Sequence, residues 1–119
     1  MSGLKGKRVL LVEDEAVIAF ALEDMLVDLG VEVVGPALRL DEAVELAATA
    51  TLDAAILDVN LNEQRSYAVA DELARRGIRF LFATGYDDGG VRWGDRQQPV
   101  LAKPYRQDQV EAALNRLLR

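Results

Sequence analysis

Polar residues that could carry out chemistry stand directly after four short apolar runs of this chain. They are Glu13-Asp14-Glu15 after residues 9–12, Asp58 after residues 54–57, Thr84 after residues 80–83, and Lys103-Pro104 after residues 100–102. If the runs are strands of one open parallel sheet, residues at their carboxyl ends meet in a single crevice. Carboxylates, a hydroxyl and an ammonium group would then share a pocket. That set of groups is what a Mg2+-dependent phosphoryl acceptor requires.

The clustered carboxylates themselves predict a bound cation. Crowding Glu13, Asp14 and Asp58 together raises the free energy of keeping all of them ionised. A hard divalent cation with oxygen ligands relieves that repulsion, so we expect Mg2+ at this place. A second interpretation is that the acids around residue 14 only cap the following helix and complement its dipole. Asp58 resists such an interpretation, because a buried apolar strand offers a carboxylate few partners.

The elements that must position these residues follow from the spacing of apolar side chains. We expect strands over residues 8–12, 31–34, 53–57, 78–83 and 100–102, and helices over residues 15–29, from Asp41 to residue 47, from Ser66 to Gly77, and over residues 110–117. Gly30 is the expected cap at the end of the first helix, Asp41 the cap at the start of the second, and Gly35-Pro36 the stop of the second strand. This alternation predicts an α/β fold. We expect a doubly wound, five-stranded parallel sheet in the order 2-1-3-4-5, inside a three-layer sandwich.

One stretch departs from the alternation. Residues 86–99, where a fourth helix is due, contain three glycines and no helical spacing of apolar residues. We expect a short or irregular fourth helix, or mostly loop. Val91 and Trp93 can still dock this stretch on the core.

The composition limits the class of protein. A chain of 119 residues that is 50% hydrophobic predicts a single domain over residues 1–119, with its core over about 7–118. The absence of cysteine and histidine excludes disulfides, thiolate zinc sites, Ser-His-Asp catalysis and a phosphohistidine on this chain. A net charge of -6 with scattered arginines argues against direct nucleic-acid binding. The lack of a long apolar run predicts no membrane span and a cytoplasmic protein.

Taken together, the motifs resemble the receiver domains of two-component response regulators over essentially the whole chain. The matching pieces are Glu13 and Asp14 in Leu-Val-Glu-Asp-Glu, Asp58 in Ile-Leu-Asp-Val-Asn-Leu, Thr84 in Phe-Ala-Thr-Gly-Tyr, and Lys103 in Leu-Ala-Lys-Pro-Tyr. The string that contains Thr84 is similar to that of the FATGUY subgroup, many of whose members are stand-alone receivers with an irregular fourth helix. Asp87 stands where the subgroup has a tyrosine.

The resemblance implies a role for each residue. Asp14 and Asp58 would bind Mg2+ directly, Glu13 through water, and Asn60 through its backbone carbonyl. Asp58 would then accept a phosphoryl group from the phosphohistidine of a histidine kinase or histidine phosphotransfer protein. The Lys103 ammonium would stabilise charge on the transferring oxygens, and the Thr84 hydroxyl would act as a switch that binds a phosphoryl oxygen. Beyond this self-phosphotransfer and autodephosphorylation, no enzyme activity is expected.

The resemblance also indicates a partner surface and one departure. The first helix and the loop after the fifth strand usually meet histidine-bearing helices, so Ala16, Val17, Phe20 and Tyr105 are candidate contacts. Val100 stands where many receivers have an aromatic residue that moves together with the threonine. The response could instead run through residues 86–99, as a hypothesis. We interpret Trp93 and Tyr105 as packing or partner-surface residues, and expect a monomer or weak dimer.

Other classes of protein remain as alternatives. A haloacid dehalogenase-like phosphatase also uses an Asp nucleophile after a strand, but it expects a second Asp where this chain has Asn60. A flavodoxin-like flavin carrier needs a Gly- and hydroxyl-rich phosphate loop where this chain has Glu13-Asp14-Glu15. A phosphorylation-independent interaction module is a third alternative. Within the receiver interpretation, a free-standing signalling, phosphorelay or sink protein competes with a receiver excised from a hybrid kinase or multidomain regulator.

Overall fold

A five-stranded parallel sheet forms the middle layer of the fold. This computed structural model describes residues 3–61, 64–85, 91–93, 96–98 and 100–118. The strands of the sheet are β1 (Arg8–Val12), β2 (Glu32–Ala37), β3 (Ala54–Asp58), β6 (Arg79–Thr84) and β9 (Val100–Ala102). They pair in the order β2-β1-β3-β6-β9, which confirms the predicted order 2-1-3-4-5 and the doubly wound fold.

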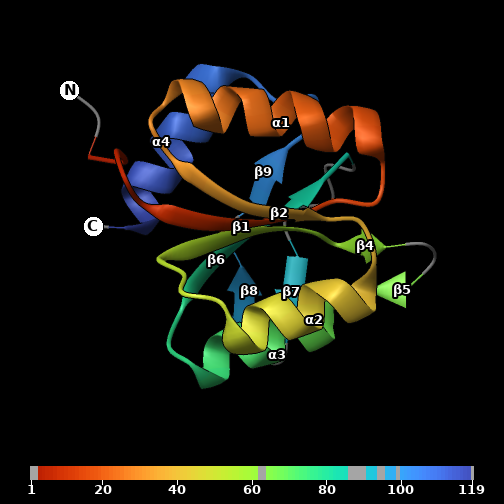
Figure 1. Cartoon of the computed structure of the whole chain (residues 1–119). Coiled ribbons are helices and arrows are strands. Elements are labelled where there is room, and N and C mark those ends of the chain that lie inside the picture. The colour runs from red at the N-terminus through yellow and green to blue at the C-terminus, as the bar shows by residue number, and fades with distance from the viewer. Residues whose placement is uncertain (1–2, 62–63, 86–90, 94–95, 99, 119) are drawn as a thin grey trace.

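Helices cover both faces of this sheet. The helices α1 (Ala16–Asp28) and α4 (Gln107–Leu117) lie on one face, and α2 (Leu40–Thr49) and α3 (Tyr67–Arg75) lie on the other (Figure 1). The sheet and its two helix layers make the predicted three-layer sandwich. Within the ranges that the structure describes, no helix combines the length and the apolar character that crossing a bilayer requires.

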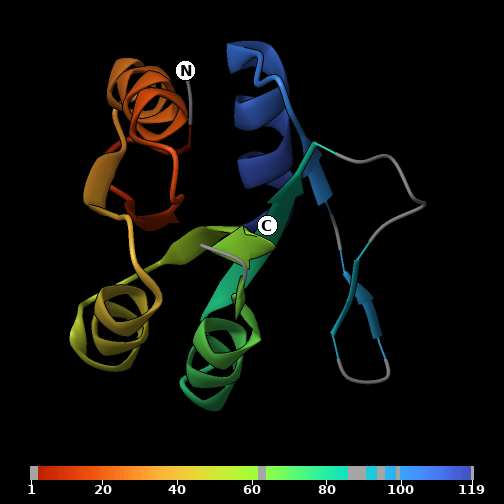
Figure 2. The same ribbon diagram turned by 90° about the vertical axis from the view of Figure 1, so that its right-hand side faces the viewer.

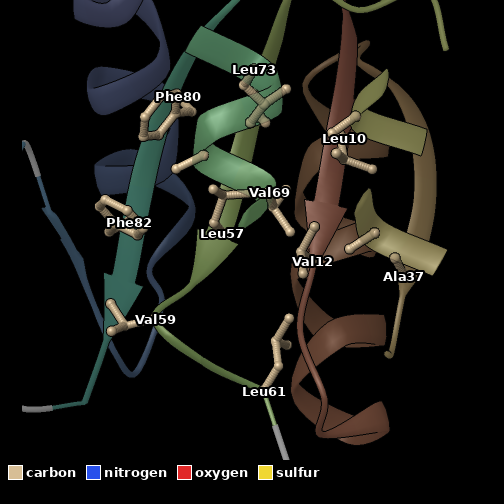
Figure 3. Close-up of a cluster of buried hydrophobic side chains, with 14 residues drawn as sticks. Leu10, Val12, Ala37, Leu57, Val59, Leu61, Val69, Leu73, Phe80 and Phe82 are labelled. Atoms are coloured by element: carbon tan, nitrogen blue, oxygen red, sulfur yellow. The ribbon is translucent and has the colours of Figure 1, made fainter. Parts of the chain in front are cut away.

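The sheet divides the core into two apolar clusters, because successive side chains of a strand point to opposite faces. Leu10 and Val12 of β1 belong to the cluster under α2 and α3, whereas Val9 and Leu11 belong to the cluster under α1 and α4. Figure 3 shows the first cluster, where side chains of β1, β3 and β6 meet those of α3. Both β1 and β3 are buried over almost their whole length, which explains their continuous apolar sequences.

The second strand runs further than the sequence predicted. Gly35-Pro36 does not stop it, because β2 continues to Ala37. The register between β1 and β2 shifts at this point, so the dipeptide sits in a bulge, which an edge strand tolerates. Gly35 has a φ of +100°, and a Cβ there would lie 2.6 Å from the backbone nitrogen of Ala37. The Ala37 carbonyl in turn accepts a hydrogen bond from Glu13 N–H (3.0 Å), so the bulge helps to place the first acidic residue.

The second helix begins earlier than the predicted cap. Arg39 occupies the N-cap position of α2, and Asp41 lies in the first turn. The Asp41 carboxylate accepts hydrogen bonds from the Arg39 side chain (3.0 Å) and from Glu42 N–H (2.9 Å). The predicted Asp41 cap is therefore wrong, although an acid in the first turn still complements the helix dipole. Gly30 and Gly77 follow α1 and α3 with φ of +85° and +72°, as predicted for the ends of these helices.

Two short strands stand where the sequence predicted a short or irregular fourth helix. They are β7 (Val91–Trp93) and β8 (Arg96–Gln98), which pair in antiparallel fashion. Both lie at the β9 edge of the sheet, on the side of α2 and α3 (Figure 2). Glycines disfavour a helix in this stretch, and Val and Trp favour strands, which explains the correction. The predicted docking of Val91 and Trp93, and the role suggested for residues 86–99, fall outside what the structure describes.

Candidate functional site

The predicted site residues lie together at one edge of the sheet. Glu13 and Asp14 follow β1, Lys103 follows β9, and Asp58 and Thr84 are the last residues of β3 and β6. Lys103 N–H donates a hydrogen bond to the Thr84 carbonyl (3.1 Å), which holds the ends of β6 and β9 next to each other. The strands are parallel, so their carboxyl ends meet on the same side, as the sequence analysis assumed.

Three carboxylates form the centre of this acidic site. One oxygen from each of Glu13, Asp14 and Asp58 lies within 4.8 Å of the others. Glu13 is 1% exposed and Asp58 is 7% exposed, so two of the three groups are removed from water. Glu15 N–H donates to Glu13 Oε1 (3.3 Å), and Asn60 N–H donates to Asp58 Oδ1 (3.2 Å). Glu15 occupies the N-cap position of α1, and its side chain makes no capping hydrogen bond.

The Lys103 ammonium joins the two buried carboxylates. Its Nζ lies 2.8 Å from Glu13 Oε2 and 3.0 Å from Asp58 Oδ2. Glu13 Oε2 is buried and accepts no hydrogen bond of regular geometry from the residues that the structure describes, so the ion pair with Lys103 balances its charge. The sequence predicted that Lys103 shares a pocket with the carboxylates, but not that its ammonium bridges Glu13 and Asp58.

These groups change one another's protonation. Burial raises the pKa of Glu13 to about 7, and a hydrogen bond with Asp58 adds to the rise, while Lys103 lowers it. Burial by itself lowers the pKa of Lys103, but its hydrogen bonds to Glu13 and Asp58 outweigh that effect, and the pKa is raised. Near neutral pH the metal-free site therefore holds a charged lysine beside a Glu13 carboxyl that is only partly ionised.

The raised pKa of Glu13 predicts that the free energy of unfolding of the metal-free protein depends on pH. The native state holds this proton up to about pH 7, whereas the unfolded chain releases it near the ordinary pKa of 4.5. Between these values the native state binds more protons, so this group lowers the free energy of unfolding as pH rises, by a few kcal/mol in total. Urea unfolding in EDTA at about pH 5 and about pH 8 measures the change.

The matched variant for this measurement is Glu13→Gln, which cannot titrate. Its stability should change less than that of the wild type across the same window. Mg2+ added at the higher pH should restore stability to the wild type, because a cation that binds the ionised site stabilises the native state. Equal pH dependence in the two proteins would contradict the assignment of this proton to Glu13.

Tyr105 is a neighbour of the site that the sequence analysis assigned only to packing or to the partner surface. Burial raises the pKa of its phenol, and the negative charges of Glu13 and Asp58 raise it further, so the hydroxyl stays protonated. The ring packs against the apolar cluster under α1 and α4. The position of Tyr105, two residues after Lys103, is the signal that could have indicated its proximity to the carboxylates.

Asn60, whose carbonyl is the predicted fourth protein ligand of the metal, lies in the short strand β4 (Asn60–Leu61). β4 pairs with β5 (Gln64–Arg65) in antiparallel fashion. Ser66 N–H donates a hydrogen bond to the Val59 carbonyl (2.9 Å), which holds the end of β5 near the end of β3. The backbone of Asn60 is thus held close to Asp58.

An apolar cavity of about 390 Å3 lies beside the site, between α1 and the residues that follow β9. Its lining residues are Val17, Ile18, Ala21, Met25, Lys103, Pro104 and Tyr105. Val17 and Tyr105 are two of the predicted partner contacts, and the other two, Ala16 and Phe20, are exposed on α1. The cavity therefore lies next to Lys103 of the acidic site.

Comparison with known proteins decides the family. The family model described as the response regulator receiver domain matches residues 9–115. The chain is a response regulator receiver domain. This result confirms the resemblance that the motifs around Glu13, Asp58, Thr84 and Lys103 indicated. A receiver domain is a signalling phosphoacceptor of two-component systems and not a classical enzyme.

Solved and curated relatives agree with this family. The receiver domain matches the solution structure of SdrG from Sphingomonas melonis Fr1 with a TM-score of 0.82 and 44% identity, over 100% of both chains. The receiver domain of sensor histidine kinase PA1611 from Pseudomonas aeruginosa PAO1 matches with a TM-score of 0.81 and 27% identity, over 95% of this chain and 98% of that one. That structure has a magnesium ion coordinated in its active site cleft.

One curated relative is longer than this receiver domain, and the match covers only part of that relative's length. The phyllosphere-induced regulator PhyR of Methylorubrum extorquens is 33% identical over 115 residues, which are 92% of this chain and 43% of PhyR. The receiver domain therefore spans less than half the length of that curated relative.

Proposed function

We propose that this receiver domain accepts a phosphoryl group on Asp58 from the phosphohistidine of a histidine kinase or histidine phosphotransfer protein, in a Mg2+-dependent reaction. It would act in the cytoplasm as a stand-alone signalling, phosphorelay or sink protein. The observation that carries the proposal is the position of Lys103, whose Nζ lies 3.0 Å from Asp58 Oδ2 at the edge of the acidic site. A lysine there can stabilise the charge of a phosphoryl group that reaches Asp58.

The acidic site has the donor atoms that a magnesium ion needs. Mg2+ prefers oxygen ligands, and the carboxylates of Glu13, Asp14 and Asp58 supply them at close quarters. Among the described residues, Glu13 Oε2 also has no donor of regular geometry, so a water on the ion could satisfy it. Asp14, Asp58 and the Asn60 carbonyl would hold the ion directly. When bound, Mg2+ would neutralise the carboxylates and withdraw charge from the phosphoryl oxygens.

Three side chains of the receiver would each have a separate role in the phosphoryl transfer. An Asp58 oxygen forms a bond to phosphorus while the bond from phosphorus to the histidine nitrogen breaks, and that nitrogen keeps the electron pair. Lys103 exchanges its contact with Glu13 for one with the phosphoryl oxygens, and the Thr84 hydroxyl donates a hydrogen bond to one of them. Attack of water on the same phosphorus later returns Asp58 to its free state.

The response after transfer should differ from that of receivers with an aromatic residue in the fifth strand. Val100 lies opposite Phe82 in the pairing of β6 with β9. It packs against the cluster that contains the edge-to-face pair of Phe80 and Phe82, whose ring centroids are 5.5 Å apart. A valine cannot swing inward as an aromatic ring does. Thr84 would therefore pass the response to the residues between β6 and β9.

Intact-mass measurement after incubation with acetyl phosphate tests the proposed function. One phosphoryl adduct that forms with Mg2+ and does not form in EDTA is the expected result. If acetyl phosphate gives no adduct, a phosphorylated histidine phosphotransfer domain is used as the donor instead. A receiver domain that takes no phosphoryl group from either donor is not a phosphoacceptor, and the proposal fails.

A further inference from the structure

The negative charge of the chain is concentrated in one segment. Residues 9–38 contain seven acidic side chains and no lysine or arginine, so they carry a formal charge of -7. The other residues, with fourteen basic and thirteen acidic side chains, carry +1. This segment comprises α1, β2 and all of β1 except its first residue, Arg8. Glu13 pairs with Lys103 and Glu32 pairs with Arg8, so the negative charge that a partner meets is chiefly that of the acids of α1.

Helix α1 carries acids that lack partners among the residues that the structure describes. Glu23, Asp24 and Asp28 form no ion pair with any of them. In contrast, α2, α3 and α4 each contain one acid that pairs with an arginine, and the three distances are 3.0, 2.8 and 3.3 Å. Asp24 and Asp28 are also exposed. Their charges are therefore available to a partner.

The large apolar side chains that are exposed lie on α1 as well. Among the described residues they are Val17 (83% exposed), Phe20 (52%) and Val27 (58%). Large apolar side chains that gather at one surface indicate an interaction site. Together with α4, the helix covers its face of the sheet (Figure 1), and its first residue, Ala16, lies two positions after Asp14 of the acidic site. A partner that covers α1 is thus brought to Asp58.

The first helix of a receiver domain usually meets the histidine-bearing helix of its donor, and we propose that Asp24 and Asp28 of α1 select a donor whose helix is basic two to three turns from its histidine. The inference rests on the proposed phosphotransfer, since that reaction brings a histidine to Asp58. Asp24 and Asp28 lie about 12 and 18 Å along the helix axis from Ala16. A partner helix that crosses α1 at about 20° stays beside it over this length. Its lysines or arginines would then face the two aspartates.

The apolar and the acidic parts of α1 have different effects in this arrangement. Val17 and Phe20, with the cavity beside them, would contribute affinity for any amphipathic helix. Exposed charges chiefly set the association rate and discriminate against partners of the same sign. Asp24 and Asp28 would therefore select, among histidine-bearing proteins, those whose helix has a basic end.

A histidine phosphotransfer domain in two versions tests this selection. One version has lysines, the other glutamates, at the exposed positions two and three turns from its histidine. The affinity of each unphosphorylated version for the receiver domain is measured at low and at high salt. The wild type should bind the lysine version roughly tenfold more tightly at low salt. Asp24→Lys/Asp28→Lys should reverse this preference, and high salt should weaken it.

The matched control is Glu42→Lys/Glu45→Lys, which changes the charge equally on α2, on the opposite face of the sheet. It should keep the preference of the wild type. Equal affinity of the wild type for both versions, or a reversal by the α2 control as large as that of the α1 variant, overturns the inference. Acetyl phosphate labelling of the same proteins reports on Asp58 alone. If the receiver domain is not labelled but still prefers the lysine version, phosphotransfer is rejected. If it is labelled but shows no preference between the two versions, the docking chemistry is rejected.

Discussion

Asp58→Asn is expected to abolish phosphorylation of the receiver domain completely while the fold is kept. The amide has nearly the shape of the carboxylate but is not a nucleophile that can form an acyl phosphate. The substitution also removes one of two buried acids that share Lys103, so it relieves repulsion with Glu13. The free energy of unfolding should therefore not fall. Intact mass after incubation with acetyl phosphate and Mg2+ measures the adduct, and circular dichroism verifies the fold.

Asp53→Asn provides the control for this variant at the other end of the same strand. Asp53 is exposed, and its carboxylate accepts a hydrogen bond from Arg8 N–H (2.8 Å), far from the acidic site. Its adduct should equal that of the wild type. An adduct that persists in Asp58→Asn would place the acceptor on another residue and would remove the basis of the proposed function.

Lys103→Met is expected to slow phosphorylation by a factor of roughly 10²–10³, as the loss of one group that stabilises transition-state charge does in enzymes. The side chain keeps an unbranched stem but loses Nζ, so no cation remains to meet the phosphoryl oxygens. The same change should tighten Mg2+ binding, because the ammonium no longer competes for Glu13 and Asp58. The rate of adduct formation and a Mg2+ titration measure the two effects, which have opposite signs.

Lys7→Met is the matched control for this charge. Lys7 precedes β1 at the opposite end of the sheet, so neither the rate nor the Mg2+ affinity should change. The removal of Lys103 also leaves Glu13 buried without its cation, so unfolding is measured in parallel to confirm that the variant is folded at the assay temperature. An unchanged phosphorylation rate would exclude Lys103 from the transfer, and weaker Mg2+ binding would contradict the electrostatic account.

The sequence predicted most elements because periodicity is a local property. A continuous apolar run such as residues 9–12 is typical of a strand that is buried on both faces, and Ile18, Leu22 and Met25 recur at helical spacing. Gly35-Pro36 looked like a stop, yet an edge strand with a bulge absorbs it. Whether a strand lies at an edge depends on the neighbours that it acquires, and these are remote in the chain.

For residues 86–99, too, the local sequence was not enough to predict the structure. Their glycines and few apolar residues predicted weak structure, but not whether described parts of the stretch would be helical or extended. The strands β7 and β8 form through pairing with each other, a contact that single-residue propensity does not contain. Of the short or irregular helix, or mostly loop, that was expected here, the described residues 91–93 and 96–98 show no helix, while the sheet order around them was confirmed.

The residues alone predicted the alternation of strands and helices and the placement of chemical groups at strand ends, because both follow from local spacing and from the geometry of parallel sheets. Three properties appear only in the folded chain: Lys103 joins Glu13 to Asp58, burial raises the pKa of Glu13, and α1 exposes acids that pair with none of the described residues beside exposed apolar side chains. These properties depend on distances between residues far apart in the chain and on the water that packing removes, and no local pattern of residues encodes either.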